Sequence, residues 1–166
     1  MRPIRYHLGI ALFLSAASCL LISKSSVAQT TGDADVAVVT HPDIPIDSLS
    51  LVEVRRVFLG ERQYWNAKLP VVLLIRAPVA RERDVVLSLI YQMTEAQFKQ
   101  YWIAKIFRAE ITTAPKIVYS NDMENDLVRA LPGAIAFMDA RTASRLGLKI
   151  LRVEGHLPGE QGYLLR

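Results

Sequence analysis

The chain has 166 residues, of which 51% are hydrophobic and 22% charged. This length is typical of about one globular domain, and the apolar fraction excludes a largely disordered chain. A single cysteine, Cys19, excludes an internal disulfide framework and a cysteine-based zinc site. The formal net charge of +4 is mildly basic, but most of it comes from the N-terminal segment.

Residues 1–28 are predicted to be a secretory signal peptide. Arg2 and Arg5 precede an apolar run of 15 residues (8–22), and the small residues at 26–28 suit cleavage by a signal peptidase. The run is shorter than the roughly 20 residues that span a bilayer. We therefore expect a periplasmic protein with no membrane span after cleavage. An uncleaved anchor and lipidation of Cys19 are left open as alternatives.

The mature chain, residues 29–166, would be nearly neutral. Cleavage would remove three basic side chains and no acid, which leaves a formal charge of +1. A chain without a cationic surface field is not expected to bind nucleic acid or an anionic membrane. Without Cys19 it could also fold in an oxidising compartment with no redox assistance.

Alternating strands and helices follow in chain order. Runs rich in β-branched and apolar residues predict strands at 36–39, 69–75, 116–119, 134–138 and 148–153. Helical spacing predicts helices at 50–59, from 79 to 93, from 94 to 106, from 120 or 121 to 131, and at 140–145. The first and third begin with capping boxes, Ser50 with Glu53 and Thr94 with Gln97. The residues expected to face inward include Val86, Leu89, Ile90, Met93, Phe98, Tyr101, Trp102 and Ile106.

The order of these elements indicates the fold class. The strand at 69–75 does not alternate apolar with polar residues, which is typical of a strand covered on both faces in a parallel sheet. Strands separated by helices indicate βαβ units. We therefore predict one α/β domain with a mainly parallel central sheet over residues 29–166, followed by a tail from Gly155 without a clear period.

The sequence contains no motif that brings catalytic side chains together. His41 and His156 lie in proline- or glycine-bearing loops and are expected to be surface histidines without a metal partner. No serine has a nucleophile elbow around it, and no glycine-rich phosphate loop is present. We expect a non-enzyme with no catalytic residue, metal site or cofactor. A secreted hydrolase is the least supported alternative.

Arg76 is the one candidate ligand-binding residue. It directly follows the predicted strand at 69–75 and precedes the helix that begins near Val79. Ligands of open α/β sheets bind at the carboxyl ends of strands, where an arginine can hold an oxyanion with two parallel hydrogen bonds. The alternative is a solvated face on which Arg76 and its neighbouring arginines, Arg81 and Arg83, pair with acids at 82 and 84.

Two motifs resemble the periplasmic phosphate-binding proteins of ABC transporters. The first is Ser-Leu-Ser-Leu at 48–51, followed by Val-Phe-Leu-Gly at 57–60 and then Trp65; the second is Pro-Gly-Ala-Ile-Ala-Phe at 132–137. The similarity extends over residues 36–139. It implies a type II periplasmic-binding-protein-like fold in a short form with a single lobe. The implied function is a secreted solute-binding-protein-like module for phosphate or another small oxyanion.

The resemblance also shows departures that bear on function. Where that family reads Arg-x-Asp-Gly-Ser-Gly-Thr, only Arg76 is kept; Ala80 replaces the serine, Arg81 the glycine and Glu82 the threonine. Because the family encloses its ligand between two lobes, a single lobe implies that an envelope protein or a second copy completes the cleft. The alternative is a non-catalytic periplasmic accessory domain that has lost small-molecule binding.

Overall fold

The computed structural model describes residues 34–111 and 113–166, so the predicted signal peptide (1–28) and Cys19 lie outside the described residues. The strands are β1 (Val36–Thr40), β2 (Ser48–Leu49), β3 (Tyr64–Asn66), β4 (Leu69–Pro70), β5 (Val72–Arg76), β6 (Lys116–Val118), β7 (Ala134–Asp139) and β8 (Lys149–Val153). The helices are α1 (Leu51–Phe58), α2 (Arg81–Val86), α3 (Glu95–Phe107), α4 (Asn121–Ala130) and α5 (Ala140–Arg145), and a π-helical turn η1 (Leu87–Tyr91) directly follows α2. In this part of the chain, every helix is too short or too polar to cross a bilayer.

Six strands form one sheet in the order β2-β8-β1-β7-β5-β6. Strand β5 is parallel to β6 and β7, and β2 is parallel to β8, whereas β1 is antiparallel to both of its neighbours. All strands of this sheet except β1 therefore run in one direction, and their carboxyl ends share one edge. This confirms the predicted α/β class with a mainly parallel central sheet.

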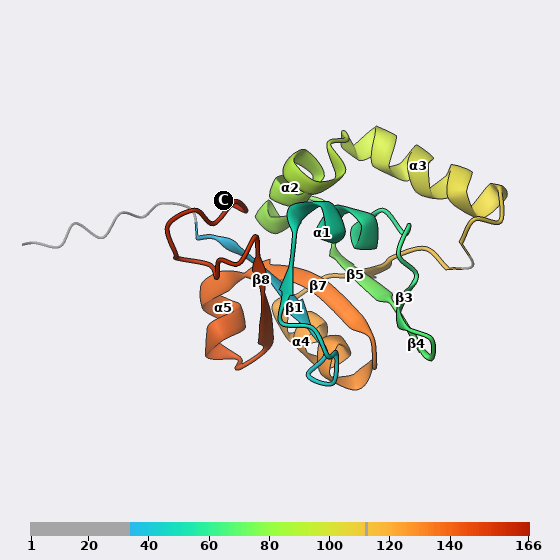
Figure 1. The fold of residues 1–166 in the computed structure, drawn as a ribbon. Coiled ribbons are helices and arrows are strands. Elements are labelled where there is room, and N and C mark those ends of the chain that lie inside the picture. Colours follow the sequence, from blue (N-terminus) through green and yellow to red (C-terminus); the bar gives the residue numbers. More distant parts are fainter. Residues whose placement is uncertain (1–33, 112) are drawn as a thin grey trace, which may run out of the picture. The chain divides into compact units, whose positions relative to one another are not determined.

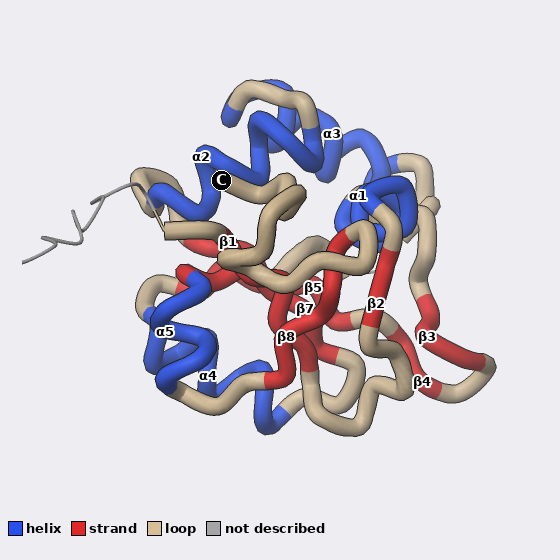
Figure 2. The backbone as a smooth tube through the Cα atoms, turned by 60° about the vertical axis from the view of Figure 1, so that its left-hand side comes forward, coloured by secondary structure: helices blue, strands red, loops and turns tan. Residues whose placement is uncertain are grey.

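Helices cover both faces of the sheet (Figures 1 and 2). Alternate residues of β1 belong to two separate clusters: Val36 and Val38 pack with α1, α2 and α3, whereas Ala37 and Val39 pack with α4 and α5. A strand directs successive side chains to opposite faces, so an apolar run without alternation supplies both layers at once. The burial of all five β1 residues follows from this arrangement.

The predicted starts of α1, α3 and α4 are confirmed by their caps, whereas α2, predicted from 79, begins at Arg81 without a side-chain cap. Ser50 accepts from the backbone N–H of Glu53, and the Glu53 carboxylate accepts from the Ser50 N–H at 2.8 Å. Thr94 and Gln97 form the same reciprocal pair at the start of α3, and Ser120 caps α4. Each cap satisfies backbone donors that the helix itself leaves unpaired and contributes about 1 kcal/mol.

The predicted strand at 69–75 is wrong in its extent, because the chain forms two strands there. Leu69 and Pro70 pair with β3 in a hairpin, and β5 joins the sheet only from Val72. Pro70 has no backbone N–H and cannot continue a ladder of hydrogen bonds. The N–H of Val71 donates to Gln63 and that of Val72 to Gly133, so the chain changes partner at this point.

One prediction of an inward-facing residue is also wrong, that of Ile106 in α3. Leu89 is half-buried and packs against the core as predicted, and the π-helical turn after α2 also buries Leu87 and Tyr91. A π turn holds more residues than an α turn, so the face that meets the core moves along the chain. In α3 the buried residues end at Lys105, and Ile106 is 46% exposed because the helix continues past the core.

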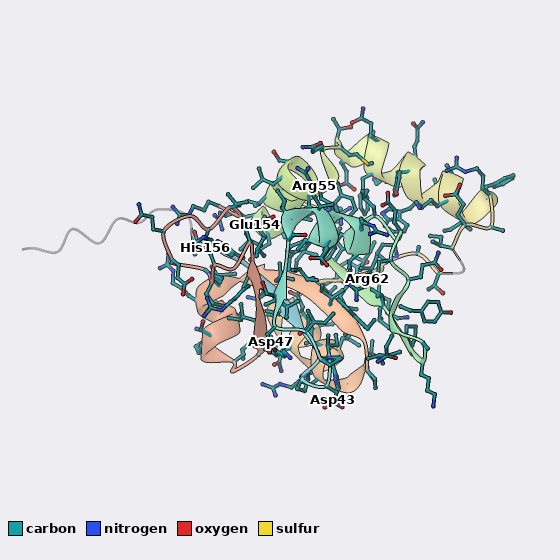
Figure 3. All side chains as sticks on the ribbon, viewed as in Figure 1. Asp43, Asp47, Arg55, Arg62, Glu154 and His156 are labelled. Atoms are coloured by element: carbon teal, nitrogen blue, oxygen red, sulfur yellow. The ribbon has the colours of Figure 1, made fainter. Side chains whose placement is uncertain are left out.

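The prediction for His41 is wrong as well. The residue is buried, and its Nδ1 accepts from the backbone N–H of Asp43 at 3.1 Å, which stabilises the turn that follows β1. His156 remains partly exposed in the loop after β8 (Figure 3). His41 therefore stabilises a turn from a buried position, whereas His156 lies in a loop at the surface.

The aperiodic tail is part of the core. Leu165 is fully buried, and its carbonyl accepts from the N–H of Val36 at 2.9 Å. The buried hydroxyl of Tyr163 donates to the Val36 carbonyl at 2.6 Å. The guanidinium of Arg166 pairs with Asp35 at 3.2 Å. The tail therefore covers the sheet edge at the start of β1, two strands away from the end of β5.

Candidate functional site

Arg76 is the last residue of β5 and lies at the carboxyl edge of the sheet. It is in register with Val118 of the parallel neighbour β6. Loops that follow parallel strands at this edge lead into helices, and α2 and α4 follow β5 and β6 in this way. The structure therefore places Arg76 at the kind of edge where α/β proteins bind ligands.

Strand alternation determines which way the Arg76 side chain extends. Leu74, two residues earlier, belongs to the cluster beneath α4 and α5, whereas Ile75 packs on the opposite face. Arg76 shares the face of Leu74. Its guanidinium accordingly reaches α4, where its Nη1 lies 3.9 Å from Oε2 of Glu124. The site is thus formed by the end of one strand and the first turns of the helix that follows the next.

Burial dominates the electrostatics of this pair. The Glu124 side chain is fully buried and that of Arg76 is 13% exposed. Desolvation raises the pKa of the Glu124 carboxyl to about 8; the guanidinium of Arg76 opposes this shift, and the nearby carboxylate of Glu82 adds to it. At neutral pH a mostly protonated Glu124 therefore faces a charged Arg76, and the ion pair forms fully only at higher pH.

Several polar atoms at this edge have unused hydrogen-bonding capacity. Arg76 Nε and Nη1, both carboxyl oxygens of Glu124 and Oδ1 of Asn121 are buried without a hydrogen-bond partner among the described residues. Buried polar groups are normally paired, and an unpaired one costs about 1–3 kcal/mol. The guanidinium can donate to an anion here, and a protonated Glu124 would not repel that anion.

The alternative prediction, a solvent-exposed face of arginines, is wrong for Arg83. This side chain is 3% exposed, and its Nε and Nη2 donate to the two carboxylate oxygens of Glu95 at 2.8 and 2.9 Å. Its Nη1 donates to the backbone carbonyl of Arg76 at 2.6 Å. The pair stabilises the ionised acid and so lowers the pKa of Glu95. Arg83 therefore positions the backbone of Arg76, whereas Arg81 donates to the carbonyl of Ala34 at 2.6 Å.

Sequence reasoning missed Glu124. The acid is four residues from the inward-facing Val128 of α4, and both residues are fully buried. Residues four apart lie on one helix face. An acid on the apolar stripe of a helix that follows a strand is therefore a local signal that could have identified Glu124. Its contact with Arg76 comes from the tertiary fold, since 48 positions separate the two in the sequence.

Comparisons with known proteins establish the fold. No protein-family model matches the chain, and no curated protein is similar to it in sequence. Among solved structures, an ABC-type phosphate transport receptor from Vibrio cholerae is similar to it with a TM-score of 0.59 at 16% identity, over 75% of this chain and 48% of that chain. PstS from Borrelia burgdorferi gives a TM-score of 0.58 at 18% identity, over 75% of this chain and 49% of that chain.

A third similar structure comes from Clostridium perfringens. It is assigned as a phosphate ABC transporter substrate-binding protein, was solved with bound phosphate, and matches with a TM-score of 0.58 at 18% identity, over 75% of this chain and 46% of that chain. The chain thus spans about half the length of the solved structures that it matches. Its fold is a single lobe of the binding-protein type.

Proposed function

We propose that this chain is an exported, periplasmic solute-binding-protein-like module that binds phosphate or a related small oxyanion at Arg76. The observation that carries the proposal is the charged guanidinium at the carboxyl edge of the sheet, opposite an acid that burial keeps mostly neutral. The fold, shared with phosphate transport receptors, supports the same ligand class. The role is one of binding, and no catalytic step is assigned to the chain.

The chemistry of the site suits a small oxyanion. A guanidinium offers paired N–H donors that match two oxygens of phosphate or sulfate. Because α4 is ten residues long, its N-terminus adds a favourable dipole beside Asn121. A single lobe contacts only one side of such a ligand, so we expect weak binding unless a second copy or an envelope protein supplies the other wall.

Calorimetric titration with phosphate and sulfate at about pH 6 tests the proposal. We expect both anions to bind, and Arg76→Gln to weaken binding by about 10- to 100-fold, the value of one charge-assisted hydrogen bond. Arg56→Gln is the matched control, because Arg56 is an exposed arginine on α1 and should leave the affinity unchanged. The proposal fails if neither anion binds, or if Arg76→Gln binds as well as the unchanged protein.

Two observations favour the accessory-domain alternative. The Arg76 guanidinium lies 3.9 Å from the Glu124 carboxyl of the same chain, which could balance its charge without any ligand. The residues at 80–82, Ala-Arg-Glu, also lack the hydroxyls of the phosphate motif. In that case a folded protein would show no heat with either anion at any pH between about 5 and 7, below the raised pKa of Glu124.

A further inference from the structure

We propose a second binding site, for a small aromatic carboxylate, in a cavity at the opposite edge of the sheet from Arg76. The cavity has a volume of about 310 Å³ and is lined by Val72 and Leu73 at the start of β5 and by Lys116, the first residue of β6. It therefore lies at the amino ends of the two strands whose carboxyl ends form the Arg76 site. Ligand pockets range from roughly 300 to 1,000 Å³, so this one suits a small molecule.

Hydrogen bonds between distant segments hold the walls of the cavity in place. The side-chain amide of Gln63 donates to the carbonyl of Glu110 at 2.8 Å and so ties the segment before the β3–β4 hairpin to the residues after α3. The Tyr101 hydroxyl donates to the carbonyl of Leu59 at 2.7 Å and ties α3 to the end of α1. A cavity fixed in this way needs little ordering when a ligand enters.

The charged side chains of the lining are all cationic. Arg62 and Lys116 line the cavity, and no acidic side chain lies among its described lining residues. Lys116 makes no ion pair with any acid in residues 34–111 and 113–166. Arg62 lies beside the hairpin (Figure 3) and donates to the carbonyls of Tyr64 and Trp65, at 3.3 Å each. Arg62 also acts electrostatically on Glu53, but Glu53 lies outside the lining, so the two cations of the lining favour an anionic ligand group.

The rest of the lining is apolar and aromatic. Val57, Pro70, Leu73 and Ile111 supply aliphatic walls, and Trp102 lines the cavity as well. The indole N–H of Trp102 is buried without an acceptor among the described residues. A planar ring suits such walls, and one carboxylate would take the charge of Arg62 and Lys116. These features together define an amphipathic ligand with an aromatic body and a single anionic group.

Titration of the purified protein with phenylacetate tests this site, with neutral phenylacetamide as the matched control ligand. The readout is the pair of tryptophan indole N–H signals in an NMR spectrum, since the chain has two tryptophans. We expect phenylacetate to shift the signal of Trp102 more than that of Trp65, whose indole is already bonded to the Gly133 carbonyl at 2.9 Å. Phenylacetamide should bind several-fold more weakly.

Three variants complete the test. Lys116→Gln should weaken phenylacetate binding by about twofold to fivefold, the value of an exposed ion pair, whereas Lys68→Gln, an exposed lysine outside the lining, should not. Ala114→Trp should block entry, because Ala114 is exposed in the lining. The inference is overturned if phenylacetate does not bind, if the amide binds equally well, or if Ala114→Trp leaves binding unchanged. The state of Arg76 affects none of these outcomes.

Discussion

The Glu124→Gln variant should be more stable than the unchanged protein above about pH 8 and equally stable near pH 4.5. Burial raises the pKa of the Glu124 carboxyl from its ordinary value of 4.5 to about 8 in the folded state. Between these two values the folded protein keeps a proton that the unfolded chain releases. The free energy of unfolding therefore falls as pH rises, by up to ~1.4 kcal/mol per pH unit, and levels off above the folded pKa. Glutamine has the shape of the protonated acid and removes this dependence.

Urea unfolding of both proteins between about pH 4.5 and pH 9 measures the effect. The difference in unfolding free energy should grow from about pH 4.5 to about pH 8 and then level off at several kcal/mol. Asp126→Asn is the matched control, because Asp126 is an exposed acid on the same helix. A parallel pH dependence in the Gln variant and the unchanged protein would show that Glu124 titrates normally in the folded state.

The Gly133→Ala variant should lose more than about 3 kcal/mol of stability or fail to fold. Gly133 has a φ of +85°, and an added Cβ would lie 2.0 Å from the backbone oxygen of Pro70. The carbonyl of Gly133 also accepts from the indole of Trp65 and from the N–H of Val72, at 2.9 Å each. A shift that relieved the clash would therefore disturb the hairpin and the start of β5 together.

Gly147→Ala is the matched control for this substitution. Gly147 has a φ of +64°, but a Cβ there would meet no atom within 4 Å. It should cost only roughly 1 kcal/mol, the strain of a positive φ for alanine. Thermal unfolding measures the stability of the two variants, and soluble yield replaces it if Gly133→Ala does not fold. A larger loss in Gly133→Ala than in Gly147→Ala is due to the collision with Pro70 and not to the positive φ alone. Equal losses in the two variants would mean that Pro70 can move away at little cost.

Local signals allowed most of the secondary structure to be predicted. The two capping boxes and the helix at 140–145 depend on residues within one or two turns, and the structure has them where the sequence placed them. The predicted strand at 69–75 failed in part because residues 69–70 and 72–76 have different partners. A run of apolar residues carries no information on which distant strand each half will meet.

Of the candidate site, only the residue at the end of the strand, Arg76, could be predicted from the sequence. Arg76 was identified because a strand end followed by a helix start is visible in one sequence. The contact of Glu124 with Arg76 joins segments that are remote in the chain, in a direction set by the sheet, and the Arg83–Glu95 pair depends on how α2 packs against the start of α3. The antiparallel direction of β1 and the packing of Leu165 against its start are likewise tertiary effects.

The central claim, that an oxyanion binds to the guanidinium of Arg76, can be tested directly at that side chain. In an NMR titration with sulfate at about pH 6, below the raised pKa of Glu124, the Nε–H signal of Arg76 and the backbone signals at the start of α4 should shift together and saturate. Sulfate that left these signals unchanged while it shifted others, or that shifted none, would contradict the account.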